Sequence, residues 1–200
     1  MYKILMFCLA LSTSTTVSAA DSLARLQAFR AIDEPFSLAF EQSLLTEDGQ
    51  AVETQSGRLQ ILPPNRFVWR YQQPFVAEFG SNGVLVWHWD PELAQVTVRD
   101  ADQVVADTPL GILLDDNVDW PVQAEGEQWL RWEPQGEQSM FTQLRVRMGA
   151  QVPAEIELVD ALGQTTRVRL TDLQIPDAKV DPRFPQVGPE TTVVDQRAAP

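Results

Sequence analysis

The chain has 200 residues, and its 44% hydrophobic and 22% charged residues are typical of a globular protein. This composition excludes collagen-like and wholly disordered chains, and the length favours one domain. Fifteen Lys and Arg residues stand against 28 Asp and Glu residues, so the formal net charge is −13. The resulting negative field argues against nucleic acids and anionic lipid surfaces as partners.

Residues 1–19 have the pattern of a secretory signal peptide. Lys3 supplies a cationic start, an apolar run follows over residues 4–11, and small residues end at Ala19. The run is far shorter than the ~20 residues that span a bilayer, so we expect cleavage after Ala19. Residues 20–200 then form a single mature domain, which has no cysteine because Cys8 lies inside the signal.

The mature chain begins with one helical pattern and continues with alternating segments. Leu26 and Phe29 belong to an apolar stripe that predicts a short helix over residues 21–33. Alternation of apolar and polar residues predicts about ten strands, near residues 36–40, 54–62, 67–71, 78–82, 84–89, 95–99, 129–132, 144–148, 155–158 and 166–170. Asn82-Gly83 is a strong hairpin signal. The connections are too short for helical crossovers, so we expect an antiparallel sheet.

Two segments depart from the alternating pattern. Thr108 can cap a helix and Pro109 suits its first position, which predicts a short apolar helix up to Leu114. The proline-rich tail from about residue 176 predicts extended coil.

The residues for catalysis by common mechanisms are scarce. His88 is the chain's one histidine, which leaves no Ser-His-Asp arrangement and no metal site to propose. Two acids alone would suffice for a glycosidase, but no pair stands out. We therefore expect a protein without catalytic residues, metal or cofactor, and keep a secreted carbohydrate-active enzyme as the alternative from another class.

Large apolar side chains are abundant on the alternating segments. They include Phe36, Phe40, Leu59, Ile61, Phe67, Trp69, Tyr71, Trp87 and Trp89. They suit either an ordinary core or an apolar ligand cavity inside a curved sheet that a short helix closes.

A series of short motifs in a fixed order resembles a known family. They are Phe36-x-x-x-Phe40-x-Gln42, Gly57-x-Leu59, Pro64-Asn65-Arg66-Phe67-Val68-Trp69, Asn82-Gly83-x-x-x-Trp87, Asp90-Pro91-x-x-x-Gln95, Thr108-Pro109, Asp160-x-x-Gly163-Gln164 and Val194-Asp195-Gln196-Arg197. Together they are similar to the outer-membrane lipoprotein carrier protein family, LolA.

The resemblance implies a mainly β fold, an incomplete (half) antiparallel β-barrel with short α-helices as a lid over an apolar cavity. It also implies a periplasmic, monomeric chaperone that binds the acyl chains of lipoproteins. An inner-membrane ABC transporter would supply this cargo and an outer-membrane receptor would accept it. A lipid-sensing or regulatory binding domain of the same fold is the alternative.

The ligand-binding residues follow from two sources. The family pattern implies Phe67 and Trp69 on the inner face, and Leu110, Leu113 and Leu114 on the lid helix. Strand parity adds five inward candidates, which are Leu59, Ile61, Phe79, Trp87 and Trp89. Pro63 stands where the family often has an arginine that hydrogen-bonds the lid, so we expect a lid held mainly by apolar contact and weaker closure.

Overall fold

The computed structural model describes residues 19–63, 66–101, 109–114, 121–126, 128–133, 141–175, 184–185 and 187–197. The predicted signal peptide lies outside the described residues except for Ala19, and so does the predicted cap Thr108. Much of the predicted tail, residues 176–183, also lies outside them.

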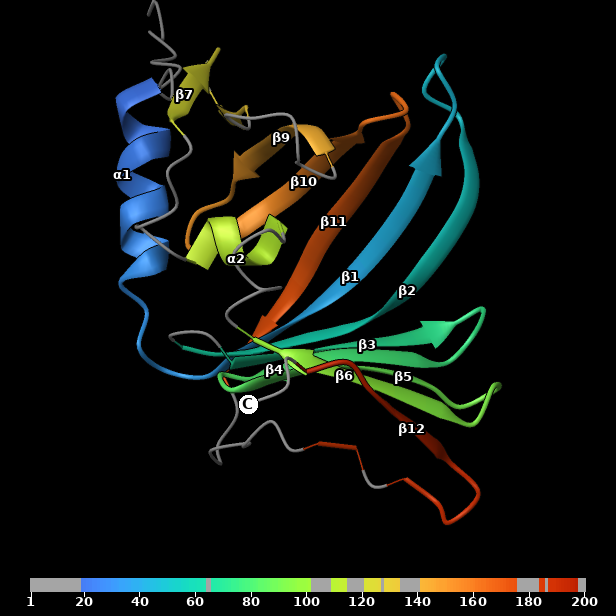
Figure 1. Ribbon diagram of the computed structural model, residues 1–200. Helices are drawn as coiled ribbons and strands as arrows, with labels where there is room; N and C mark the ends of the chain where they lie inside the picture. Colours follow the sequence, from blue (N-terminus) through green and yellow to red (C-terminus); the bar gives the residue numbers. More distant parts are fainter. Residues whose placement is uncertain are drawn as a thin grey trace, which may run out of the picture.

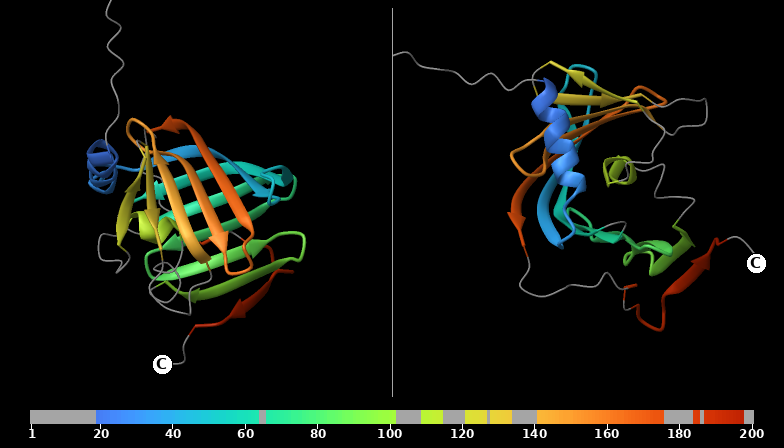
Figure 2. Two further views of the ribbon diagram at one scale, coloured as in Figure 1. Left: turned by 90° about the horizontal axis from the view of Figure 1, so that it is seen from above. Right: turned by 90° about the vertical axis from the view of Figure 1, so that its left-hand side faces the viewer.

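One curved sheet of twelve strands runs through the described chain (Figure 1). In chain order the strands are β1 (Phe36–Leu45), β2 (Ala51–Leu62), β3 (Arg66–Gln73), β4 (Ala77–Asn82), β5 (Leu85–Asp90), β6 (Gln95–Asp100), β7 (Val122–Glu125), β8 (Trp129–Trp132), β9 (Phe141–Met148), β10 (Pro153–Asp160), β11 (Thr165–Gln174) and β12 (Thr192–Asp195). Their order in the sheet is β12-β6-β5-β4-β3-β2-β1-β11-β10-β9-β8-β7. The sheet curves strongly but has free edges at β12 and β7, so the predicted incomplete barrel is confirmed (Figure 2).

Tight turns set the antiparallel pairing, as the alternation and turn residues predict. At the predicted Asn82-Gly83 turn, Asn82 Oδ1 accepts hydrogen bonds from the backbone N–H groups of Val84 at 3.0 Å and Leu85 at 2.8 Å. Gly83 has a φ of 87°, which glycine adopts without strain. The turn joins β4 to β5 and sets the register that pairs Phe79 with His88.

Two strands were not predicted. β7 has four residues, too few for alternation to stand out against its surroundings. The prediction of coil throughout the tail was wrong, because β12 pairs with β6 in parallel, and the prediction of a wholly antiparallel sheet was therefore wrong at this edge. The backbone N–H of Thr192 donates to the carbonyl of Ala94 at 2.8 Å. Such pairing joins segments that lie far apart in the sequence, so no local sequence pattern predicts it.

The two helices cover different parts of the sheet. The first, α1 (Ala19–Arg30), packs against β7, β8 and β9 through buried side chains that include Leu26 and Phe29. The second, α2 (Pro109–Leu114), lies within the curve of the sheet (Figure 2). Neither described helix has the length and apolar character needed to cross a membrane.

A main core and a smaller core lie on opposite faces of the sheet. The main core includes Leu110, Ile112 and Leu113 of α2 and therefore occupies the concave side. The smaller core holds Val68, Trp87, Val96 and Val98 on the convex side, with Trp89, Phe184 and Val187 packed against it.

Trp87 anchors the convex core. It is fully buried, and its ring lies 6.0 Å from that of Phe184 in an edge-to-face arrangement. Its Nε1 donates to Glu78 Oε1 at 2.9 Å, and Glu78 Oε2 accepts from Arg70 Nε at 2.7 Å. The prediction that Trp87 and Trp89 point into the barrel was wrong, because their strand parity places both on the face that the C-terminal segment covers.

Gly80 gives the indole of Trp87 the space it occupies. A Cβ built on Gly80 would lie 2.3 Å from Trp87 Cζ2. We therefore expect Gly80→Ala to lower the free energy of unfolding by about 1–3 kcal/mol through overpacking. Urea unfolding followed by circular dichroism measures this loss.

Gly188→Ala is the matched control, since a Cβ there meets no atom within 4 Å. Its unfolding free energy should stay within about 0.5 kcal/mol of the unsubstituted protein. Equal stability of the two variants would contradict the assigned role of Gly80.

Candidate functional site

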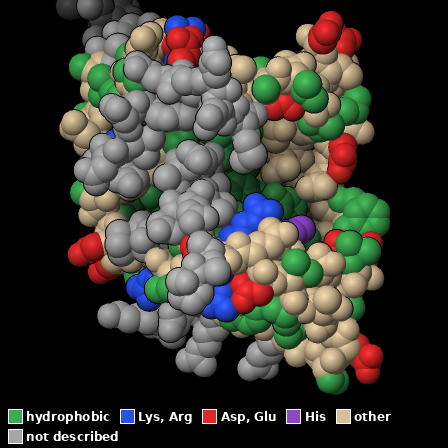
Figure 3. Space-filling model, in the orientation of Figure 1, with side chains coloured by type: hydrophobic (Ala, Val, Ile, Leu, Met, Phe, Trp, Pro, Cys, Tyr) green, Lys and Arg blue, Asp and Glu red, His purple; other side chains and the backbone are tan. Residues whose placement is uncertain are grey.

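An apolar cavity of about 420 Å³ lies between the concave face of the sheet and α2. Its volume is within the range of about 300–1,000 Å³ that is usual for small-molecule sites. The lining comes from β1, β3, β4, β5, α2, β10 and β11, with the residues Gln42, Phe67, Trp69, Tyr71, Phe79, His88, Pro109, Leu110, Ile156, Leu158, Thr166 and Val168. Figure 3 shows this side of the molecule hollowed, with hydrophobic side chains at the bottom of the hollow and the histidine near its edge.

Strand register brings the aromatic part of this lining together. Trp69 pairs with Phe79 across β3 and β4, and Phe79 pairs with His88 across β4 and β5, so the three side chains share the concave face. The rings of Phe67 and Phe79 lie 5.5 Å apart. Phe40 lies beneath, with its ring 5.1 Å from that of Trp69. The aromatic rings therefore form a continuous wall.

Two rings of this wall carry uncharged polar groups, the hydroxyl of Tyr71 and the indole N–H of Trp69. Burial raises the pKa of Tyr71 to about 12, so its phenol stays protonated at neutral pH. The Tyr71 hydroxyl donates to Gln42 Oε1 at 3.2 Å. Trp69 Nε1 is buried and has no hydrogen-bond partner among the described residues. A buried donor of this kind costs about 1–3 kcal/mol until it meets an acceptor.

Arg30 ties the lid helix α2 to α1. Its Nε donates to the carbonyl of Leu113 at 3.0 Å and its Nη2 to the carbonyl of Ile112 at 2.8 Å. These carbonyls belong to the last turn of α2, where a cation is favourable. Arg30 and Leu114 also share a small cavity with Pro63.

The expectation of a lid held mainly by apolar contact therefore needs an addition. Pro63 supplies no donor, but the guanidinium of Arg30 on α1 donates hydrogen bonds to backbone carbonyls of α2. Sequence reasoning missed it because Arg30 lies 82 and 83 residues from its two acceptors. A single arginine at the end of an amphipathic helix gives no sign of its distant partner.

The predicted ligand-binding residues fall into four groups. Phe67, Trp69, Phe79 and Leu110 line the apolar cavity. Leu59, Ile61 and Leu113 are almost completely buried in the core around it, and Leu114 lines the small cavity beside Pro63. Trp87 and Trp89 lie on the convex face.

Several lining residues were not among the predicted ones. The missed residues are Gln42, Tyr71, His88, Pro109, Ile156, Leu158, Thr166 and Val168. Strand alternation places His88 opposite to Trp87 and Trp89 on β5, and the error lay in expecting the two tryptophans to face inward. On β10 and β11 the alternation was visible, but it does not say which face becomes the cavity.

Comparison with known proteins assigns the family. The family model for the outer membrane lipoprotein carrier protein LolA matches residues 34–184. The outer-membrane lipoprotein carrier protein of Bordetella pertussis is 35% identical over 174 residues, which cover 84% of this chain and 83% of that protein. The protein of the same name from Halorhodospira halophila is 35% identical over 184 residues, or 90% of this chain and 88% of its own.

A solved structure supports the fold. The LolA superfamily protein NE2245 from Nitrosomonas europaea has a TM-score of 0.50, at 12% identity, over 81% of this chain and 95% of that one. Family model, relatives and architecture agree with the resemblance that the sequence motifs indicated, and the chain belongs to the outer membrane lipoprotein carrier protein family, LolA.

Proposed function

We propose that this protein is a periplasmic, non-enzymatic carrier that holds the acyl chains of lipoproteins in the apolar cavity under α2. The observation that carries the proposal is this cavity, walled by Phe67, Trp69 and Phe79 and covered by Leu110, in a chain of the LolA family. An inner-membrane ABC transporter supplies the cargo and an outer-membrane receptor accepts it. The net charge of −13 suits basic docking surfaces on these two partners.

The physical chemistry of acyl chains supports this role. Each methylene buried from water contributes about 0.8 kcal/mol, so lipoproteins cross an aqueous compartment only with their chains shielded. A carrier must also release them, which requires a cover that opens at small cost. A helix of six residues is not stable alone, so α2 stays closed only through its tertiary contacts.

The chemistry of the cargo also matches the polar features of the cavity. Acylated N-termini carry ester and amide carbonyl groups next to their chains. Gln42, His88 and Thr166 in the lining offer polar groups that such carbonyls can meet. The cavity thus combines apolar walls with polar groups suited to the linkage of an acyl chain.

Release of lipoproteins from inner-membrane vesicles tests the proposed function. The mature protein should bring lipoproteins into the soluble fraction, and native mass spectrometry should show the lipoprotein bound. Leu158→Asp should reduce this release by roughly tenfold or more, because it places a carboxylate in the apolar lining. Circular dichroism verifies that the variant is folded.

Leu162→Asp is the matched control. Leu162 is 93% exposed in the turn after the same strand, so release should be unchanged. A folded protein that releases no lipoprotein and carries only free lipid would instead indicate the sensing or regulatory domain.

Loss of the Arg30 contact should loosen the lid. Arg30→Met removes two charge-assisted hydrogen bonds to α2, each worth about 1.5–3 kcal/mol. We expect hydrogen exchange in residues 109–114 to accelerate by about tenfold or more, and bound cargo to pass faster to an acceptor. Hydrogen–deuterium exchange mass spectrometry measures the first effect.

Arg25→Met serves as the comparison on the same helix. Arg25 pairs with Asp21 at 2.8 Å and donates to the carbonyl of Gly149 at 3.0 Å, away from α2. Its replacement should leave exchange in α2 unchanged. Identical exchange in the two variants would show that Arg30 does not hold the lid.

A further inference from the structure

A second hollow lies beside the apolar cavity on the concave face of the sheet. It measures about 270 Å³ and is lined by Phe79, Val86, His88, Thr97 and Arg99. Phe79 and His88 also line the apolar cavity, so the two spaces meet at these residues. The second hollow differs from the first because two of its five lining residues carry basic groups.

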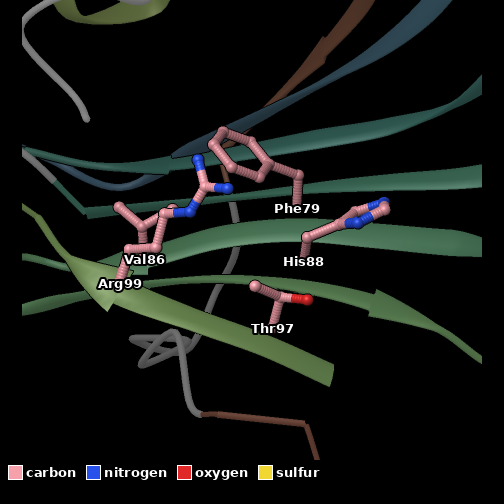
Figure 4. Close-up of a pocket in the computed structure, with 5 residues that line it drawn as sticks. All are labelled: Phe79, Val86, His88, Thr97 and Arg99. Atoms are coloured by element: carbon pink, nitrogen blue, oxygen red, sulfur yellow. The ribbon is translucent and has the colours of Figure 1, made fainter. Parts of the chain in front are cut away.

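Pairing of β4, β5 and β6 explains why these side chains gather. Phe79 pairs with His88 and His88 with Thr97, while Val86 pairs with Arg99 on the same face. Figure 4 shows the five side chains on one side of the three strands, with the Arg99 guanidinium reaching toward the ring of Phe79. Basic groups thus lie at the end of the aromatic wall.

The donors of this hollow have few partners. Arg99 Nε donates to Gln196 Oε1 at 2.8 Å, which orients the guanidinium. Among the described residues, no carboxylate lies within ion-pair distance of Arg99, and no hydrogen bond reaches the ring of His88. Thr97 Oγ1 accepts from Gln95 Nε2 at 3.4 Å, so its own hydroxyl hydrogen can point to a ligand.

Several other arginines in the described part of the chain pair with carboxylates. On the convex face, Arg145 pairs with Glu157 at 2.7 Å and Arg147 with Glu155 at 2.9 Å. The whole chain carries a net charge of −13, which repels anions in general. Arg99 and His88 therefore form a local basic site within a negative molecule.

We propose that Arg99 and His88 form a head-group subsite for an anionic group, phosphate or carboxylate, on a ligand whose acyl chain lies in the apolar cavity. This inference rests on the proposed function, because it assumes that acyl chains occupy that cavity. A guanidinium binds phosphate or carboxylate through two parallel hydrogen bonds. An amphiphile with its chain along Trp69 and Phe79 places its polar end at His88 and Arg99.

Calorimetric titration of the delipidated mature protein with three 12-carbon amphiphiles tests the subsite. The probes are lauroyl lysophosphatidate, laurate and the neutral monolauroylglycerol, each below its micellar concentration. We expect at least one anionic probe to bind roughly tenfold or more tightly than monolauroylglycerol, as a charge-assisted hydrogen bond provides. The stronger of the two anions identifies phosphate or carboxylate as the preferred group.

Substitutions locate the source of this preference. Arg99→Gln and His88→Gln should each lower the preference for the anionic probe over monolauroylglycerol. In the double variant this preference should fall below about threefold, while the affinity for monolauroylglycerol stays unchanged. Arg99→Lys should keep part of the preference because the charge remains. Arg169→Gln, at a half-exposed position on the convex side that pairs with Glu41, is the control and should keep all of it.

The outcomes separate the two proposals. Equal affinity of the wild-type protein for all three probes overturns the subsite and leaves the acyl cavity intact. A preference that survives in the double variant also overturns it. If none of the probes binds, the proposed function fails as well. Loss of all three probes in Leu158→Asp ties the binding to the apolar cavity.

Discussion

The register of β3 to β6 is the constraint on which the rest of the structure depends. Successive side chains of a strand point to opposite faces, so the register that places Trp69, Phe79 and His88 on the concave face sends Trp87 to the convex one. A tryptophan there needs cover and an acceptor, and Phe184 and Glu78 supply them. An open sheet with aromatic residues on both faces therefore requires two covers. Here α2 covers the concave face, and the C-terminal segment covers the convex one.

The two covers differ in how firmly they are held. β12 adds backbone hydrogen bonds along β6, which attach the C-terminal segment to the sheet as one more strand. In contrast, α2 makes no strand pairing and is held by apolar side chains and by Arg30. Apolar contact is not directional, whereas the hydrogen bonds from Arg30 define one position of the helix. The C-terminal segment is thus fixed to the sheet by strand pairing, whereas α2 is held by side-chain contacts.

Charge is distributed unequally between the faces of the sheet. On the convex face, Arg145 lies between Glu125 and Glu157, and its guanidinium stands 4.6 Å from the centre of the Trp129 ring. Partly exposed pairs of this kind add little stability, but they neutralise the charges there. The concave face carries uncharged apolar residues over most of the cavity, with Arg99 and His88 at one end. The concave face is therefore apolar under α2 and basic at β5 and β6. An amphiphile has the same division between its apolar chain and its polar head group.

The sequence by itself determined the local geometry of this protein. Alternation and turn residues such as Asn82-Gly83 located ten of the twelve strands, and Pro109 marked the start of α2. It did not determine which face of β5 is the interior, because a period of two defines two sets of side chains without ranking them. Nor did it show that β12 joins β6 or that Arg30 reaches α2, because these partners are distant in the chain. Only the tertiary structure decided that Trp87 belongs to the core and His88 to the cavity wall. The physical reason is that Phe184 packs on the convex face of the sheet and Leu110 on the concave face, and both are distant from β5 in the sequence.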